Sequence, residues 1–72
     1  MTLKDALDGL MVLGVASWGI GKALGVSGRE VNRMRRVQSA RTIPPAVWKP
    51  ALYRLTRERA LLLETLALQI SL

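Results

Sequence analysis

The sequence of 72 residues predicts a small all-α fold, a bundle of four to five helices. Leu, Ala, Val and Met dominate the apolar residues and aromatic residues make up only 4% of the chain, a composition that favours helices over strands. Apolar residues recur at spacings of three and four, and glycines and prolines separate these periodic segments. A chain this short buries only a small core, so we expect residues 1–72 to form a single domain.

Several classes of function are excluded by composition. The chain has neither cysteine nor histidine, which rules out a disulfide framework, a zinc finger and a histidine-based catalytic centre. We therefore expect no enzymatic activity, no cofactor, no metal and no small-molecule substrate. The N-terminus lacks the pattern of a signal peptide, and the uncharged run 9–21 is too short to span a bilayer. We expect a cytoplasmic protein that does not bind membranes.

The first predicted helix covers about Leu3 to Leu13. Thr2 and Asp5 have the spacing of a capping box, and Gly14 can end the helix in a left-handed conformation. Asp5 and Asp8 lie three residues apart, but with no histidine or metal-ligand cluster beside them we interpret them as stabilising the positive end of the helix dipole.

A second and a third helix are separated by a turn of about three residues. Ser17 is expected to cap the second helix, over about 18–24, and Gly25 to end it. Ser27, with Glu30 three residues later, has the spacing of another capping box, so the third helix starts at once. This arrangement is typical of a helix-turn-helix, which we place at residues 17–36.

The third helix has one apolar and one cationic face. Val31 and Met34 share the apolar face at helical spacing. The opposite face carries Arg29, Asn32, Arg33 and Arg36.

The positive charge of the chain is concentrated around this helix. The formal net charge is +6, and six cations and a single acid, Glu30, lie between Lys22 and Arg41. Such a patch predicts attraction to a polyanion such as nucleic acid or anionic lipid. A cationic outer face on the second helix of a helix-turn-helix is what a reader of duplex DNA needs.

The C-terminal part is predicted to form a helix over about 50–70, with a kink or a restart at Pro50 because proline lacks the amide that a continuing helix uses. Trp48 is expected to pack in the core, whereas Trp18 is left open. The segment 60–72 is apolar on nearly all sides, which is unusual for a surface helix. We favour a dimer interface for it over packing in the core or binding to a membrane. The residues expected in that interface are Leu61, Leu62, Leu66, Leu68 and Ile70.

The segment SWGIGKALGVSGREVNRMRR, residues 17–36, resembles the helix-turn-helix of the Cro/CI family of phage repressors. Gly21 matches the small residue where the two helices cross, and Gly25 matches the glycine of the turn. The internal apolar positions are matched by Ile20, Leu24, Val26, Val31 and Met34. The resemblance, which extends less specifically over residues 3–58, implies a lambda-repressor-like fold and a phage or prophage origin.

The resemblance implies a sequence-specific transcriptional regulator, a Cro-like repressor that binds a pseudo-palindromic operator as a homodimer. The third helix would then lie in the major groove. Its expected base contacts are Ser27, Gly28, Arg29, Asn32, Arg33 and Arg36, with Gly28 allowing close approach of the backbone. The expected phosphate contacts are Ser17, Lys22, Arg35 and Arg41.

Two other classes of function stay open at this point. A small phage-type protein could use the same scaffold as a protein-binding module that inhibits a host protein. Alternatively, a basic protein could condense nucleic acid without sequence preference, in which case binding would depend steeply on salt.

Overall fold

The computed structural model describes residues 1–37 and 43–72, and every regular element within them is an α-helix. The four helices are α1 (Leu3–Val12), α2 (Ser17–Leu24), α3 (Gly28–Arg36) and α4 (Pro45–Ser71). The prediction of an all-α fold is confirmed, with the smaller of the two expected helix counts in the described ranges.

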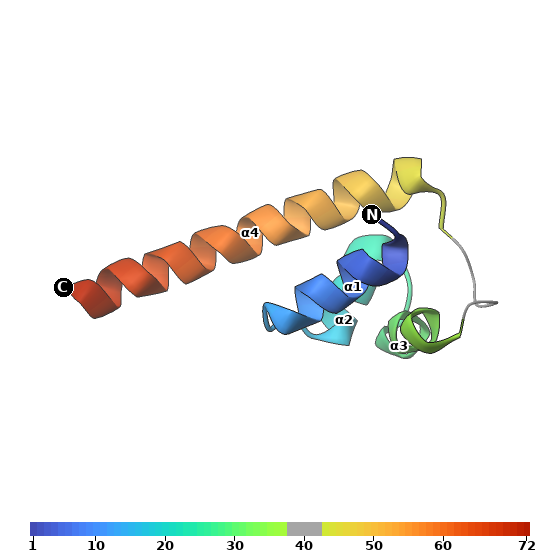
Figure 1. The fold of residues 1–72 in the computed structure, drawn as a ribbon, viewed down its shortest axis with the longest axis horizontal. Helices are drawn as coiled ribbons and strands as arrows, with labels where there is room; N and C mark the ends of the chain where they lie inside the picture. Colours follow the sequence, from blue (N-terminus) through green and yellow to red (C-terminus); the bar gives the residue numbers. More distant parts are fainter. Residues whose placement is uncertain (38–42) are drawn as a thin grey trace.

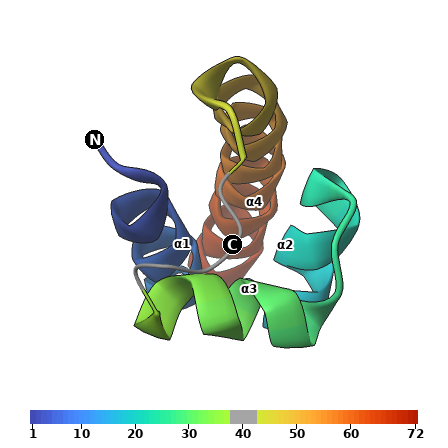
Figure 2. The same cartoon turned by 90° about the vertical axis from the view of Figure 1, so that its right-hand side faces the viewer.

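The molecule consists of a compact part and a projecting helix (Figure 1). We call α1, α2, α3 and residues 45–59 the head, and residues 60–72 the tail. In the head, α1 and α2 lie on either side of α4, and α3 lies across the end of the bundle opposite α4 (Figure 2). The tail extends beyond the head, so the molecule measures 48 × 21 × 20 Å.

A small apolar core holds the head together. Its buried residues are Leu7, Leu10, Ile20, Val31, Met34, Trp48 and Leu52. Leu24 and Val26 pack against this cluster and are partly buried. The internal positions that the sequence predicted for 17–36 therefore all contact the core, and Trp48 packs in it as expected. Burial of apolar surface is the main stabilising contribution.

The ends of α1 and α3 follow the capping pattern of the sequence. The Thr2 hydroxyl accepts a hydrogen bond from the Asp5 amide (3.2 Å), and the Asp5 carboxylate accepts one from the Thr2 amide (3.3 Å). Ser27 accepts from the amide of Glu30 at 3.1 Å. Both interactions satisfy amides that have no partner within their helix.

Two glycines close the turns that precede and follow α2. Gly14 has φ +87° and Gly25 has φ +77°, values that cost little only for glycine. At the end of α2, the amide of Val26 donates to the carbonyl oxygen of Gly21 at 2.8 Å, which closes the connection to α3. The predicted stops at both glycines are confirmed.

The start of α2 differs from the prediction. Ala16 is the N-cap and its side chain makes no capping bond, so the expectation that Ser17 caps the helix was wrong. Ser17 is already the first helical residue, and its hydroxyl is directed to α3 instead.

The expected restart at Pro50 is absent, because α4 runs without interruption from Pro45 to Ser71 with Pro50 inside it. Pro45 stands at the first helical position, where its missing amide costs nothing. The amides of Val47 and Trp48 both donate to the carbonyl oxygen of Pro44, so the first turn forms there. Burial of Trp48 against α1–α3 favours this earlier start, and it offsets the one helical bond that Pro50 cannot donate.

The tail makes no contribution to the core. Its large side chains Leu61, Leu62, Leu66, Leu68 and Ile70 are between 52% and 75% exposed. The interpretation of this segment as part of an intramolecular core is therefore wrong. In the described ranges, no helix has the length and apolar character needed to cross a bilayer.

Candidate nucleic-acid interface

The outer surface of α3 carries three exposed arginines. Val31 and Met34 face the core. Because successive helical residues are about 100° apart, the opposite side of α3 is the one that includes Arg29, Asn32, Arg33 and Arg36. The three arginines are exposed and Asn32 is half-buried. Since α3 lies opposite α4, this surface points away from the rest of the molecule (Figure 2).

The position of α3 depends on a close approach at Gly21. This glycine is buried, and a Cβ added to it would lie 2.5 Å from the carbonyl oxygen of Val26 and 3.0 Å from that of Ser27. These neighbours are backbone atoms that cannot rotate away. The missing side chain therefore lets the connection 25–27 fold back against α2. The sequence predicted a close approach at this position, but between the two helices themselves.

Gly28 has a role that the sequence did not predict. We expected this glycine to let a nucleic acid approach the backbone of the third helix. In the structure, a Cβ at Gly28 would lie 3.0 Å from the amide nitrogen of Trp18 and 3.1 Å from its Cα. The space above Gly28 is thus filled by the N-terminus of α2, and the glycine serves packing inside the head.

Ser17 and Asn32, which were assigned to a phosphate and to a base, contact each other. The Ser17 hydroxyl donates to Oδ1 of Asn32 at 2.6 Å. This bond connects the first residue of α2 to the middle of α3 and fixes the orientation of the Asn32 carboxamide. The Asn32 side chain is thereby held beside the arginine face and does not rotate freely.

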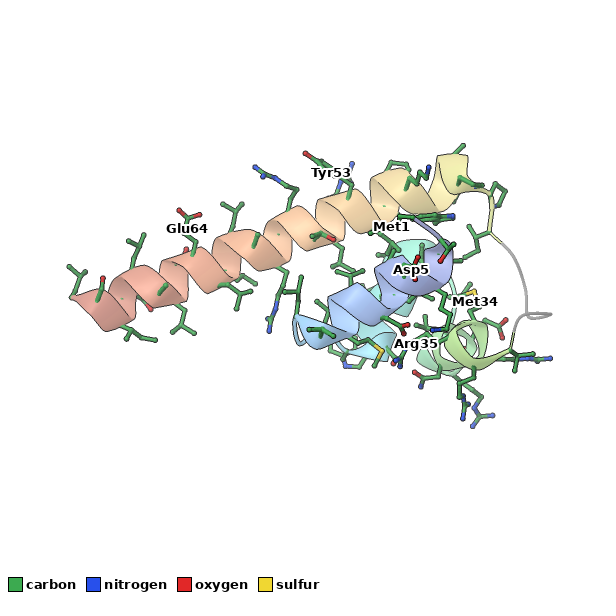
Figure 3. The ribbon with its side chains drawn as sticks, viewed as in Figure 1. Met1, Asp5, Met34, Arg35, Tyr53 and Glu64 are labelled. Carbon is green, nitrogen blue, oxygen red and sulfur yellow. The ribbon has the colours of Figure 1, made fainter. Side chains whose placement is uncertain are left out.

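Arg35 is held by α1. Its Nε donates to Oδ1 of Asp8 at 2.7 Å, and Oδ2 of Asp8 accepts from Nζ of Lys4 at 2.8 Å. Arg35 lies where α3 approaches α1 (Figure 3). Arg35 is half-buried, unlike Arg33 and Arg36. Its guanidinium therefore connects α3 to α1. The hydrogen bond from Lys4 and then the one from Arg35 lower the pKa of Asp8.

This pair predicts a specific dependence of stability on pH. A pKa that is lower in the folded than in the unfolded state means that ionised Asp8 stabilises the fold. This stabilisation by ionised Asp8 is complete at pH values above the ordinary pKa range of a carboxyl group. It is lost as the pH falls through the lowered pKa of the folded state. Asp8→Asn should therefore lower the melting temperature at neutral pH. On acidification, the melting temperature of the variant should approach that of the unsubstituted protein.

Thermal unfolding followed by circular dichroism between neutral pH and about pH 2 measures this difference. Glu58→Gln, which neutralises an exposed carboxylate on α4, is the matched control and should show a small, nearly constant difference. A difference for Asp8→Asn that did not shrink on acidification would contradict the role of the ion pair.

The remaining predicted contacts are distributed around α3. Ser27 caps the helix and is exposed, and Lys22 is exposed in the last turn of α2. Nε of Arg36 donates to the carbonyl oxygen of Asn32 at 3.3 Å. Arg41 lies outside the described residues.

The structure also contains a surface that the sequence did not reveal. A groove of about 570 Å³ lies between α1 and α4, away from the arginine face. Its walls include Gly9 and Leu10 from α1, Leu13 at the C-cap of α1, and Leu52, Tyr53 and Thr56 from α4. Leu13, just after α1, is 40% exposed, so this apolar side chain is only partly covered.

Comparisons of the chain with protein-family models, with curated proteins and with solved structures find no match.

Proposed function

We propose that the chain is a sequence-specific DNA-binding transcriptional regulator. In this proposal α2, the connection 25–27 and α3 form a helix-turn-helix of the Cro/CI type, and α3 enters the major groove. The protein acts as a homodimer on a pseudo-palindromic site, and it represses transcription by occupying DNA that polymerase needs.

One observation carries the proposal, namely the exposed arginine face of α3. Arg29, Arg33 and Arg36 project from one side of a helix whose other side is buried. An arginine can donate two hydrogen bonds to O6 and N7 of guanine, and a major groove admits one α-helix. Two neighbouring side chains of α3 are engaged with other helices, Asn32 with Ser17 and Arg35 with Asp8. The three arginines of the outer face are exposed to solvent.

The packing of α2 against α3 supports the same proposal. A helix-turn-helix needs a small residue where its helices meet and a turn that reverses the chain within a few residues. Gly21, with backbone of Val26 and Ser27 against it, and Gly25, with its positive φ, supply both. Lys22 and the N-terminal turn of α2 would then lie near the phosphates, which set the register of the helix on the duplex.

The proposal is tested by fluorescence anisotropy with two labelled duplexes, one from the DNA that flanks the protein's own gene and one with the same base composition in scrambled order. Titrations at two salt concentrations around the physiological value separate specific from electrostatic binding. A preference of about a thousandfold for the natural flank is expected for a site-specific regulator. Where the flank is not preferred, selection from a pool of random duplexes finds the favoured sequence.

Two outcomes would contradict the proposal. Equal binding to all duplexes with a steep salt dependence would indicate a non-specific condenser of nucleic acid. Absence of binding to any duplex at physiological salt would indicate a protein-binding module on the same scaffold, and the exposed Trp18 would then be the first residue to examine.

A further inference from the structure

A continuous strip of small and apolar residues runs along one side of α4, from the head to the end of the tail. On the head it is the wall of the groove beside α1, where Tyr53 and Thr56 lie. Steps of three and four residues stay on one side of a helix, so the same side continues into the tail. The tail residues on this side are Ala60, Leu63, Ala67 and Ile70.

The other sides of the tail differ in character or in direction. The side toward α2 carries the polar residues Thr65 and Gln69, in line with Glu58 on the head. Leu61 and Leu68 face away from the head, and Leu62 and Leu66 continue the side of α4 that faces α3. Two copies that paired through either of these last two sides would direct their α3 helices in opposite directions. Pairing through the α1 side keeps both α3 helices on the same side of the assembly.

We propose that the groove between α1 and α4 is occupied by the tail of a second copy, whose α4 runs antiparallel. Each tail then lies in the groove of the other copy, with Leu66 and Ile70 over α1. Core positions in an antiparallel pair alternate, which fixes the register. Ala60 lies against Leu63 of the second copy, Thr56 against its Ala67, and Tyr53 against its Ile70.

The charges beside the strip fit this register. Arg57 and Glu64 are seven residues apart, are both exposed, and flank the strip on the same edge. In the antiparallel register, Arg57 of each copy lies beside Glu64 of the other, which gives two equivalent ion pairs. A parallel arrangement would instead bring equal charges to the same level along the helices.

The length of α4 relates this pairing to the proposed function, on which this step and the choice of the α1 side both rest. The centre of the register lies between residues 61 and 62, and the head is anchored on α4 by Trp48 and Leu52. At about 1.5 Å per residue, each head lies about 17 Å from the centre, and the two heads are about 34 Å apart along α4. This is the distance of about 34 Å between successive major grooves on one face of B-DNA.

Disulfide trapping tests the register directly, since the chain has no cysteine of its own. Full-length Thr56→Cys and Ala67→Cys are mixed in equal amounts and oxidised mildly. The expected product is the mixed disulfide between the two variants, identified by intact mass spectrometry, because the Thr56→Cys and Ala67→Cys chains differ in mass. The matched control is the mixture of Leu61→Cys and Leu68→Cys, which should not cross-link. Predominant disulfides between identical Thr56→Cys chains would indicate a parallel pair and overturn the proposal.

Charge exchange tests the same pairing without a covalent bond. Arg57→Glu or Glu64→Arg alone turns two attractive pairs into two repulsive ones and should raise the dimer dissociation constant about tenfold in sedimentation equilibrium. The double variant restores opposite charges and should return to within about threefold of the unsubstituted protein. A dissociation constant of the double variant as high as those of the single variants would contradict the register.

Failure of this pairing and failure of the proposed function are distinguishable. A dimer with the expected cross-link that binds no duplex would retain the pairing and contradict DNA binding. A monomer that prefers one duplex sequence would contradict the pairing and retain DNA binding.

Discussion

Gly21→Ala is expected to destabilise the head by about 3 kcal/mol, at the upper end of the cost of overpacking a buried site. The added Cβ would lie 2.5 Å from the carbonyl oxygen of Val26, and both that atom and the neighbouring Ser27 carbonyl belong to the backbone. Relief requires α2 to move away from the turn that positions α3. For a domain of this size, such a loss lowers the melting temperature by roughly 15 °C.

Gly19→Ala is the matched control in the same helix. A Cβ at Gly19 meets only Cγ1 of Val15, at an ordinary contact distance of 3.8 Å. Alanine is a better helix former than glycine, so this variant should gain about 0.5–1 kcal/mol. Circular dichroism melts of both variants at equal protein concentration make the comparison. Equal stability of the two variants would contradict the close approach at Gly21.

Arg33→Ala is expected to lower the affinity for the preferred duplex by about tenfold to a hundredfold, because a bidentate pair with guanine contributes about 1–3 kcal/mol of discrimination. Its affinity for a scrambled duplex should fall much less. Arg33 is exposed and points away from the core, so its removal should leave the melting temperature almost unchanged. The measured quantity is the ratio of the two dissociation constants in anisotropy titrations.

Arg54→Ala removes the same charge from an exposed position on α4 and is the control for net charge. It should weaken binding to both duplexes slightly and by the same factor. The sequence-based expectation for Arg41 is similar, since a phosphate contact carries no information about bases. If Arg33→Ala, like Arg54→Ala, lowered the affinities for the preferred and the scrambled duplex by the same factor, base reading by Arg33 would be refuted.

Local signals predicted the elements of the head well. The capping bonds of Thr2 and Ser27 and the left-handed glycines at 14 and 25 depend on residues within a few positions of one another. The faces of α3 followed from spacing alone, because Val31 and Met34 are the only large apolar residues between 28 and 36. These features depend on residues that are close together in the sequence, so local patterns are sufficient to predict them.

The side-chain hydrogen bonds between helices were not predicted. The bond between Ser17 and Asn32 joins residues 15 positions apart, and Arg35 meets Asp8 across 27 positions. Only the pairing of Lys4 with Asp8, four residues apart, had a local signal that could have been recognised. The helical start at Pro45 was missed because burial of Trp48 overrides the local preference for a break at Pro50.

Because α4 is uninterrupted, the number of residues between head and tail sets both the length of the helix and the direction in which the side chains of the tail point. One residue inserted after Leu55 would lengthen α4 by about 1.5 Å and turn every later side chain by about 100°, away from its present neighbours. Seven inserted residues would almost restore the direction while adding about 10 Å. Insertions and deletions in this helix should therefore be tolerated in whole heptads. Each heptad would change the distance by which the tail extends beyond the head in a discrete step.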